Sequence, residues 1–282
     1  MEKKKKYGTL IIGTVLLIVS ILFTLYAYHT SYQKSLRLGD VLTESEKLYY
    51  QRPYAYGLTI VFFSIMLAVK GIYNAVVGVT VTHKNNVTRL AQAGLLAALC
   101  YIGFAFFKID IPVGPEKTAF HFGNVFCVLA ALLLGGYWGG LAGAIGMTIG
   151  DLTTSYVTSA PKTFFLKLCI GLIVGFVAHK IFKLSKEHSV KYVTGVTVLA
   201  SACGMAFNIV ADPLVGYFYK TYLLGVPQDI SKALAKIAAL TTSVNAVVAV
   251  IAASVFYIAL RPALKKSGLF VSLHGEEKKE KK

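Results

Sequence analysis

Eight polar residues interrupt stretches of the chain that are otherwise apolar. They are cationic lysines, anionic aspartates, and asparagine or histidine side chains that both donate and accept hydrogen bonds. Inside a bilayer each is costly unless it lines a cavity or pairs with another polar group. A buried ion pair or hydrogen bond would explain any single one equally well, but the set favours a cavity that binds a small polar molecule. The residues are His121, Asn124, Asp151, Lys167, Asn208, Asp212, Lys236 and Asn245.

The sequence lacks the motifs of the common ATPases and membrane enzymes. It has no G-x-x-x-x-G-K-[ST] loop to cradle a nucleotide, no H-E-x-x-H and no G-x-S-x-G. Its six histidines are scattered without metal-ligand spacing, and its four cysteines lie in apolar runs without a C-x-x-C pair. We therefore expect neither an enzyme nor a metal site, no covalent cofactor, and an energy source outside this chain.

The composition requires a membrane protein. Hydrophobic residues make up 56% of the 282 residues and charged residues only 15%, and the apolar residues come in runs long enough to cross a bilayer. The expected fold is all-α, a polytopic bundle with the lipid bilayer as its environment. The eight expected spans lie near residues 8–28, 54–82, 90–107, 120–136, 139–156, 163–182, 192–219 and 233–260.

The charge distribution predicts the orientation. The net charge of +16 (29 − 13) comes from clusters between apolar runs, not from a basic groove with aromatic residues, so nucleic-acid binding is not expected. With eight spans, all four clusters fall on one side, and the positive-inside rule places both termini in the cytoplasm, where anionic lipid is a secondary attraction. The first span lacks an A-x-A site and is long for a signal peptide, so we expect an uncleaved anchor. The clusters contain Lys3 to Lys6, Lys84 and Arg89, Lys180 to Lys191, and Lys265 to Lys282.

This orientation places most of the polar set in the outer half of the membrane. A cavity open to the outside follows, with Asn245, which lies deeper in the last span, as a candidate for its floor. Aromatic residues at the same level could stack on a planar ring, although belt residues at the interface would look the same. They are Tyr156, Phe164, Phe165, Phe207 and Tyr217.

Small residues recur at helical spacing. Gly139, Gly143, Gly146 and Gly150 share one helical face, which predicts close packing of helices within the chain. A second stripe of small residues lies in the third span, at Ala93, Gly94, Ala97 and Ala98.

The chain divides into three parts by composition. Residues 1–84 form an expected transmembrane hairpin around an external loop, 30–52. Residues 89–262 form a six-helix core with short connections, and residues 263–282 form a charged cytoplasmic tail.

Four motifs in the core carry a family resemblance. They are IPVGPEKTAFHFGN (111–124), GGYWGGLAGAIG (135–146), GDL (150–152) and TFFLKL (163–168). Their order resembles the S component, the substrate-binding membrane subunit, of energy-coupling factor (ECF) transporters, in particular the riboflavin-type family. The resemblance implies a flavin as transported ligand, in the riboflavin, FMN or FAD class. It also implies a coupling transmembrane subunit and two cytoplasmic ATPases as partners, with the Ala93 to Ala98 stripe docking on the coupling subunit. S components typically stop at six helices, so the hairpin 1–84 departs from the pattern.

Other functions fit the same sequence features. The glycine-rich motifs occur in S components for pyridoxine-type or thiamine-precursor-type vitamins, and the lysines allow a phosphorylated flavin or outward delivery of flavin. A self-sufficient secondary transporter would need inverted repeats, and no convincing repeat is present. A membrane scaffold that recruits a partner through residues 30–52 is a third class. Co-purified ATPases and ligand would distinguish these classes.

Overall fold

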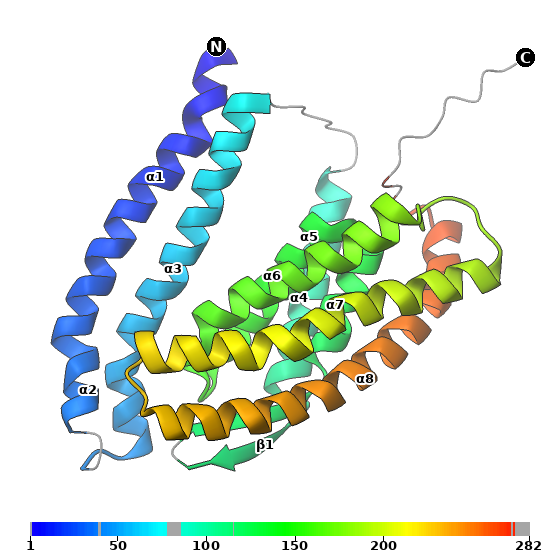
Figure 1. Ribbon diagram of the computed structural model, residues 1–282. Helices are drawn as coiled ribbons and strands as arrows, with labels where there is room; N and C mark the ends of the chain where they lie inside the picture. Colours follow the sequence, from blue (N-terminus) through cyan, green and yellow to red (C-terminus); the bar gives the residue numbers. More distant parts are fainter. Residues whose placement is uncertain (1, 39–40, 78–85, 115, 272, 274–282) are drawn as a thin grey trace, which may run out of the picture. The chain divides into compact units, whose positions relative to one another are not determined.

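The computed structural model describes residues 2–38, 41–77, 86–114, 116–271 and 273. It consists of helices and one two-stranded sheet (Figure 1). The chain forms two compact units. The N-terminal unit contains Met1–His83 and Asp151–Phe164, and the core unit contains Lys84–Gly150 and Phe165–Lys282.

The N-terminal unit is built on two long antiparallel helices, α1 (Glu2–Ala27) and α3 (Glu44–Val77). They pack closely where small residues meet, because Gly13 of α1 lies against Ala68 of α3 and Gly57 of α3 lies against Thr24 of α1. A short π-helix (Tyr28–Tyr32) and α2 (Gln33–Arg37) extend α1. The unit also contains the short helix η3 (Val157–Ser159), which packs on α3.

The connection between α1 and α3 is shorter than the loop expected at 30–52. Most of that range is helical in the structure: α2 ends at Arg37 and α3 begins at Glu44. A capping box starts α3, since the Thr43 backbone N–H donates to the Glu46 carboxylate at 2.9 Å and the Glu46 N–H donates to the Thr43 hydroxyl at 3.4 Å. This T-x-x-E signal explains why the helix starts before the apolar run.

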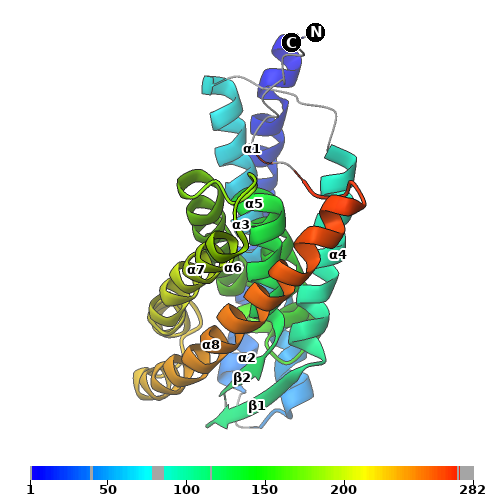
Figure 2. The ribbon, with the colours of Figure 1, turned by 90° about the vertical axis from the view of Figure 1, so that its right-hand side faces the viewer.

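The core unit contains α4 (Asn86–Ala105), a β-hairpin, most of α5 (Gly123–Thr153) and most of α6 (Ala160–Gly175), followed by α7 (Val190–Phe218) and α8 (Gln228–Lys266). One-turn π-helices extend α6 (Phe176–Ile181) and α7 (Tyr219–Leu223). Two views at a right angle show α7 and α8 side by side (Figures 1 and 2).

The expectation of an all-α fold is corrected by the β-hairpin. The fold is mostly helical and includes one two-stranded sheet. Strand β1 (Lys108–Val113) pairs antiparallel with β2 (Glu116–His121), with Lys108 opposite His121. Alternating Ile109, Ile111 and Val113, followed by Gly114 at φ +60°, form a strand and a turn. The six-residue run of β1 lies between the expected spans 90–107 and 120–136.

Helix α5 is a helical hairpin that folds back at Gly135. Gly135 has φ +79° and ψ 174°, a conformation that glycine tolerates and other residues rarely adopt. The two arms pack against each other: Gly123 lies against Met147, and a methyl group on Gly143 would come within 2.9 Å of the Cys127 sulfur. In a continuous helix residues 123 and 147 would be about 36 Å apart. The two arms correspond to the expected spans 120–136 and 139–156.

Glycines pack the second arm of α5 on its neighbours. Gly146 lies against the backbone of Ala97 on α4, and Gly150 lies against the ring of Phe104. Gly171 and Gly175 of α6 meet the backbones of Gly140 and Gly136 so closely that a methyl group would collide. The predicted packing role of this glycine face is confirmed.

Six helices of the described chain are long and apolar enough to cross a membrane: Leu10–Arg37, Val87–Ala105, Gly123–Thr153, Val157–Ile181, Val190–Leu223 and Gln228–Lys266. The polytopic helical membrane fold is confirmed. Eight spans were expected, and the difference has two sources. Gly123–Thr153 counts once although it folds back, and the expected span 54–82 falls partly on α3 and partly on residues 78–82, which lie outside the described residues.

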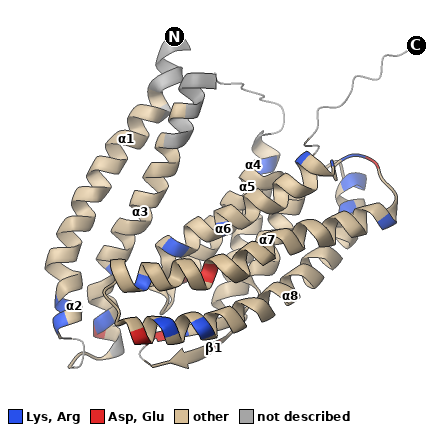
Figure 3. Cartoon of the chain, in the orientation of Figure 1, with Lys and Arg blue, Asp and Glu red and all other residues tan. Residues whose placement is uncertain are grey.

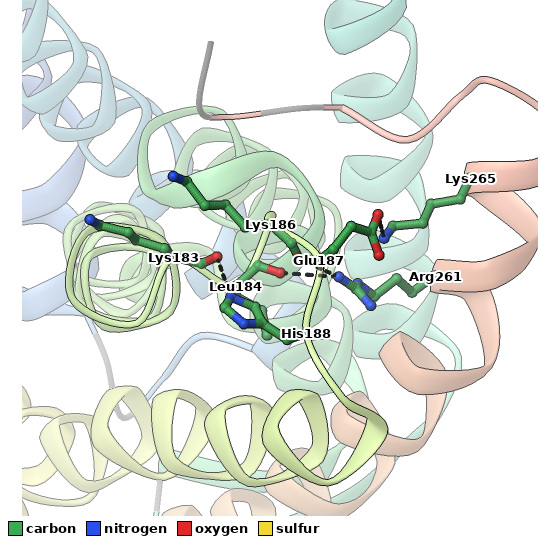
Figure 4. Close-up of polar contacts among 7 residues, drawn as sticks. All are labelled: Lys183, Leu184, Lys186, Glu187, His188, Arg261 and Lys265. Carbon is green, nitrogen blue, oxygen red and sulfur yellow. Dashed lines mark hydrogen bonds and ion pairs between the residues drawn. The ribbon is translucent and has the colours of Figure 1, made fainter. Parts of the chain in front are cut away.

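The antiparallel order gives the core unit two distinct ends. At the β-hairpin end lie β1 and β2, the end of α7 and the start of α8. At the Gly135 end lie the turn of α5, the α6–α7 connection (182–189) and the end of α8. Arg261 of α8 ties these segments together by donating to the carbonyls of Lys186 (2.8 Å) and Leu184 (3.4 Å), and Lys265 pairs with Glu187 at 2.6 Å (Figure 4).

Candidate functional site

The β-hairpin is anchored on α8 by Asn245. The Asn245 Oδ1 atom accepts from the His121 backbone N–H at 3.0 Å, and its Nδ2 donates to the Ala119 carbonyl at 3.0 Å. The carboxamide thus pairs with β2 as a neighbouring strand would. The Thr118 and Thr241 hydroxyls add a second link at 3.1 Å. Asn245, which the sequence suggests as the floor of a cavity, therefore also positions the hairpin.

His121 lies in the field of three charged residues, Lys167, Asp212 and Lys108. Its ring packs edge-on against Phe104 at 5.0 Å, and Nδ1 is buried without a hydrogen-bond partner among the described residues. Burial, the cation Lys167 and, to a smaller extent, Lys108 together lower the pKa of His121 to about 3, against an opposing effect of Asp212. The imidazole is therefore neutral at physiological pH, and the structure brings His121 within electrostatic range of Lys167 and Asp212.

Asn124 and Asn208 hold buried hydrogen-bond acceptors. Their side chains are 2% and 1% exposed, and each Oδ1 atom has no hydrogen-bond partner within the described part of the chain. Buried polar atoms are rarely left unsatisfied in folded proteins, so each such atom needs an explanation. A bound ligand that donates hydrogen bonds would supply one.

Helix packing brings these residues to one region with Lys167. Gly204 of α7 packs on Ile170 and Val174 of α6, so Asn208, one turn further along α7, lies level with Lys167 in this antiparallel pair. Lys167 also interacts electrostatically with Cys127, which lies on the same face of α5 as Asn124, three residues away. Asp212, one turn beyond Asn208, accepts from the Thr242 hydroxyl of α8 at 2.9 Å.

Two of the predicted residues are placed differently. Lys236 lies on the exposed side of α8 and not with the buried polar residues. Asp151 is buried in the last turn of α5 and belongs by its packing to the N-terminal unit. Of the aromatic residues, Phe207 packs against the core, Phe165 is about half exposed and Tyr217 is partly buried. Tyr156 and Phe164 belong to the N-terminal unit.

A cavity of about 300 Å³ opens beside His121 and Asn245. Its other lining residues come from the hairpin and α8 and are mainly apolar or aromatic: Phe106, Phe107, Lys108, Ile109, Phe120, Phe122, Val244 and Val248. Its volume lies at the lower end of the range for small-molecule sites. Aromatic walls with a few polar groups are typical of sites for planar ligands.

The sequence reasoning missed an ion pair that closes the hairpin. Lys220, 5% exposed at the end of α7, pairs with Glu116 at the start of β2. The two residues are 104 positions apart, and without the strand assignment no sequence signal connects them. The predicted set also omitted Thr242, whose contact with Asp212 depends on the α7–α8 register.

The small-residue stripe on α4 divides between two faces. Ala93 is 8% exposed and Ala97 lies against Gly146 of α5, so both face the interior of the core unit. Gly94 and Ala98 are exposed, with open space beside Gly94.

Residues 84–262 match the family model described as "ECF-type riboflavin transporter, S component". Searches of curated proteins and of solved structures gave no match. The matched range is more than half of the 282 residues and contains all four motifs from which the resemblance was inferred, so that inference is confirmed. The chain belongs to the family of S components of ECF-type riboflavin transporters, as a substrate-binding transport subunit and not an enzyme.

Proposed function

We propose that the chain binds a flavin, riboflavin or a phosphorylated form, at the β-hairpin end of the core unit. The observation that carries this proposal is the pair of buried amide oxygens on Asn124 and Asn208, neither of which has a hydrogen-bond partner among the described residues. An isoalloxazine ring offers a ring N–H for such an acceptor and carbonyls that can accept from the Lys167 ammonium. Neutral His121 gives the site a further hydrogen-bonding group at Nδ1, which donates or accepts according to its tautomer, and Phe104 and Phe120 supply aromatic surface.

The hairpin forms one wall of this site. Asn245 and Thr241 hold β2 on α8, and the Glu116–Lys220 pair holds its other end on α7. A flavin ring has more polar edge atoms than Asn124, Asn208 and Lys167 can satisfy. We therefore propose that backbone groups of the hairpin contribute the remaining hydrogen bonds, and that Lys236 and Asp151 act outside the ring site.

The ligand is tested by mass spectrometry of the purified chain, because a tightly bound vitamin survives purification. Riboflavin or its mononucleotide in the denatured extract supports the proposal. A pyridoxine-type or thiamine-related compound in its place would assign another vitamin to the same S-component fold.

For transport, we propose that the chain works with a coupling transmembrane subunit and two cytoplasmic ATPases. The chain has no nucleotide-binding loop of the G-x-x-x-x-G-K-[ST] type. The exposed Gly94 and Ala98 offer a face of α4 on which another helix can approach closely, so we assign docking to these two residues of the stripe, with Ala93 and Ala97 supporting them from inside. Co-purification of ATPases with the tagged chain tests the partners.

We propose that the chain lies in the cell membrane with its Gly135 end and both termini in the cytoplasm. Within the core unit, the α6–α7 connection and the end of α8 carry Lys183, Lys186, Lys265 and Lys266 at one end, as the positive-inside rule requires (Figure 3). The test is a single cysteine at Ser45 or Ser185 in a cysteine-free variant. In intact cells an impermeant thiol reagent should label Ser45→Cys and not Ser185→Cys, and the reverse pattern would invert the orientation.

A further inference from the structure

A second and larger cavity lies at the Gly135 end of the core unit, opposite the β-hairpin. Its volume is about 670 Å³. The glycines Gly135, Gly136 and Gly175 leave bare backbone at its base, where the turn of α5 touches α6. Its walls are Tyr137, Trp138, Leu172, Ile173, Phe176, His179, Lys180 and Leu273. The proposed flavin site uses none of these residues.

The interior of this cavity is apolar. His179 is the only buried ionisable residue among its lining residues, and both of its ring nitrogens are engaged. Nε2 lies 3.0 Å from the Leu132 carbonyl and Nδ1 lies 3.0 Å from the Ser185 hydroxyl. Because a carbonyl can only accept, Nε2 carries the hydrogen and Nδ1 accepts from Ser185. The ring therefore offers no polar group to a ligand.

One cation stands at the rim. Lys180 is exposed in the last turn of the α6 extension, next to lining residues that are themselves outward-facing: Phe176 is 58% and Leu172 43% exposed. These residues belong to the candidate span Val157–Ile181. The cavity thus opens beside a membrane-spanning segment, close to the position where that segment ends.

The surroundings of the rim are basic. Lys183 and Lys186 follow on the α6–α7 connection, and their side chains point away from the Arg261 contacts (Figure 4). The nearest acidic residue along that connection, Glu187, is paired with Lys265. A ligand that reaches Lys180 therefore meets net positive charge.

We propose that this cavity binds an anionic phospholipid, with an acyl chain against the glycine floor and Trp138 and the phosphate beside Lys180. Apolar walls suit an acyl chain, and basic residues near a membrane surface attract anionic headgroups. A soluble anion would gain nothing from the apolar walls. A flavin has polar atoms along its whole edge and would meet mostly apolar wall there, with Lys180, Tyr137 and Trp138 as the lining side chains that could bind them.

Trp138 is the single tryptophan of the chain and makes the proposal directly measurable. The protein is reconstituted in phosphatidylcholine vesicles containing increasing fractions of phosphatidylglycerol with brominated acyl chains, which quench tryptophan on contact. We expect half-maximal quenching at a several-fold lower mole fraction for brominated phosphatidylglycerol than for brominated phosphatidylcholine. In Lys180→Gln the preference should fall about fivefold, the value for one basic residue near the surface.

Lys191→Gln is the matched control, because Lys191 is exposed at the same end of the core unit, at the start of α7, and does not line the cavity. Its preference should equal that of the wild type, and thermal unfolding verifies that each variant is folded. Equal quenching by both lipids would show that Trp138 contacts bilayer lipid without preference for an anionic headgroup, and would overturn the proposal. Quenching by neither lipid would show that the cavity is closed or holds another occupant, and would also overturn it.

Discussion

Removing the charge of Lys167 should weaken flavin binding strongly while leaving the protein folded. Lys167 is 6% exposed on α6, level with Asn208 of α7 and within electrostatic range of His121. Lys167→Met keeps the length of the side chain and removes the ammonium group. The loss of one charged hydrogen bond costs about 1.5 to 3 kcal/mol, which corresponds to a roughly 10- to 150-fold rise in Kd.

Isothermal titration calorimetry with riboflavin and with its mononucleotide measures this change. A larger loss for the mononucleotide would place the ammonium beside the phosphate, whereas equal losses would place it beside the ring. Lys232→Met serves as the control, because Lys232 is exposed near the start of α8, and its Kd should match the wild type. Unchanged affinity for both flavins in folded Lys167→Met would remove Lys167 from the site and refute the reasoning from helix register.

Three further predictions follow from the core unit. The pKa of His121 is lowered from 6.5 to about 3, so between these pH values protons bind preferentially to the unfolded chain. The stability of the protein should therefore be full above pH 6.5 and fall as the pH drops from 6.5 towards 3. The thermal unfolding temperature of His121→Gln should depend less on pH over this range. Gly175→Ala should destabilise the fold by about 1 to 3 kcal/mol, because its methyl group collides with the backbone of Gly136, whereas Gly195→Ala, in open space on α7, should be neutral or slightly stabilising in the same denaturation assay. Ala98→Trp should weaken co-purification with the coupling subunit and leave riboflavin affinity unchanged. Leu199→Trp, on the exposed side of α7, is the control. Loss of flavin affinity with intact assembly would contradict the assignment of α4 to docking.

The sequence predicted much of the architecture because the bilayer imposes strong rules. Apolar runs of span length located the helices of the core unit. The glycine spacing of Gly139 to Gly150 located a packing face that the structure confirms. The turn at Gly135 lies one residue before the end of the expected span 120–136, at the G-G pair where a reversal is possible.

Other features depend on partners that are distant in the sequence. Asn245 lines the cavity beside His121 and also pairs with the edge of β2, a strand that the pattern of residues 108–121 did not reveal. Helical spacing alone could not decide which side of α4 meets α5, and so Ala93 and Gly94 were grouped although they face different ways. Lys236 belongs to the predicted polar set because it lies near the start of a span, but it is exposed in the structure. Which side of a helix is exposed depends on neighbouring helices that a single sequence does not identify.

The central claim is that this chain binds a flavin through buried polar groups at the β-hairpin end of the core unit. The most direct measurement is equilibrium binding of riboflavin to the purified, flavin-depleted chain and to the folded double variant Asn124→Leu, Asn208→Leu. Both substitutions replace an amide by an apolar group of similar size, so they remove the unsatisfied acceptors without opening a large cavity. The account predicts one riboflavin per wild-type chain and at least a tenfold loss of affinity in the double variant. Absence of flavin binding by the folded wild type, or equal affinity in the double variant, would contradict it.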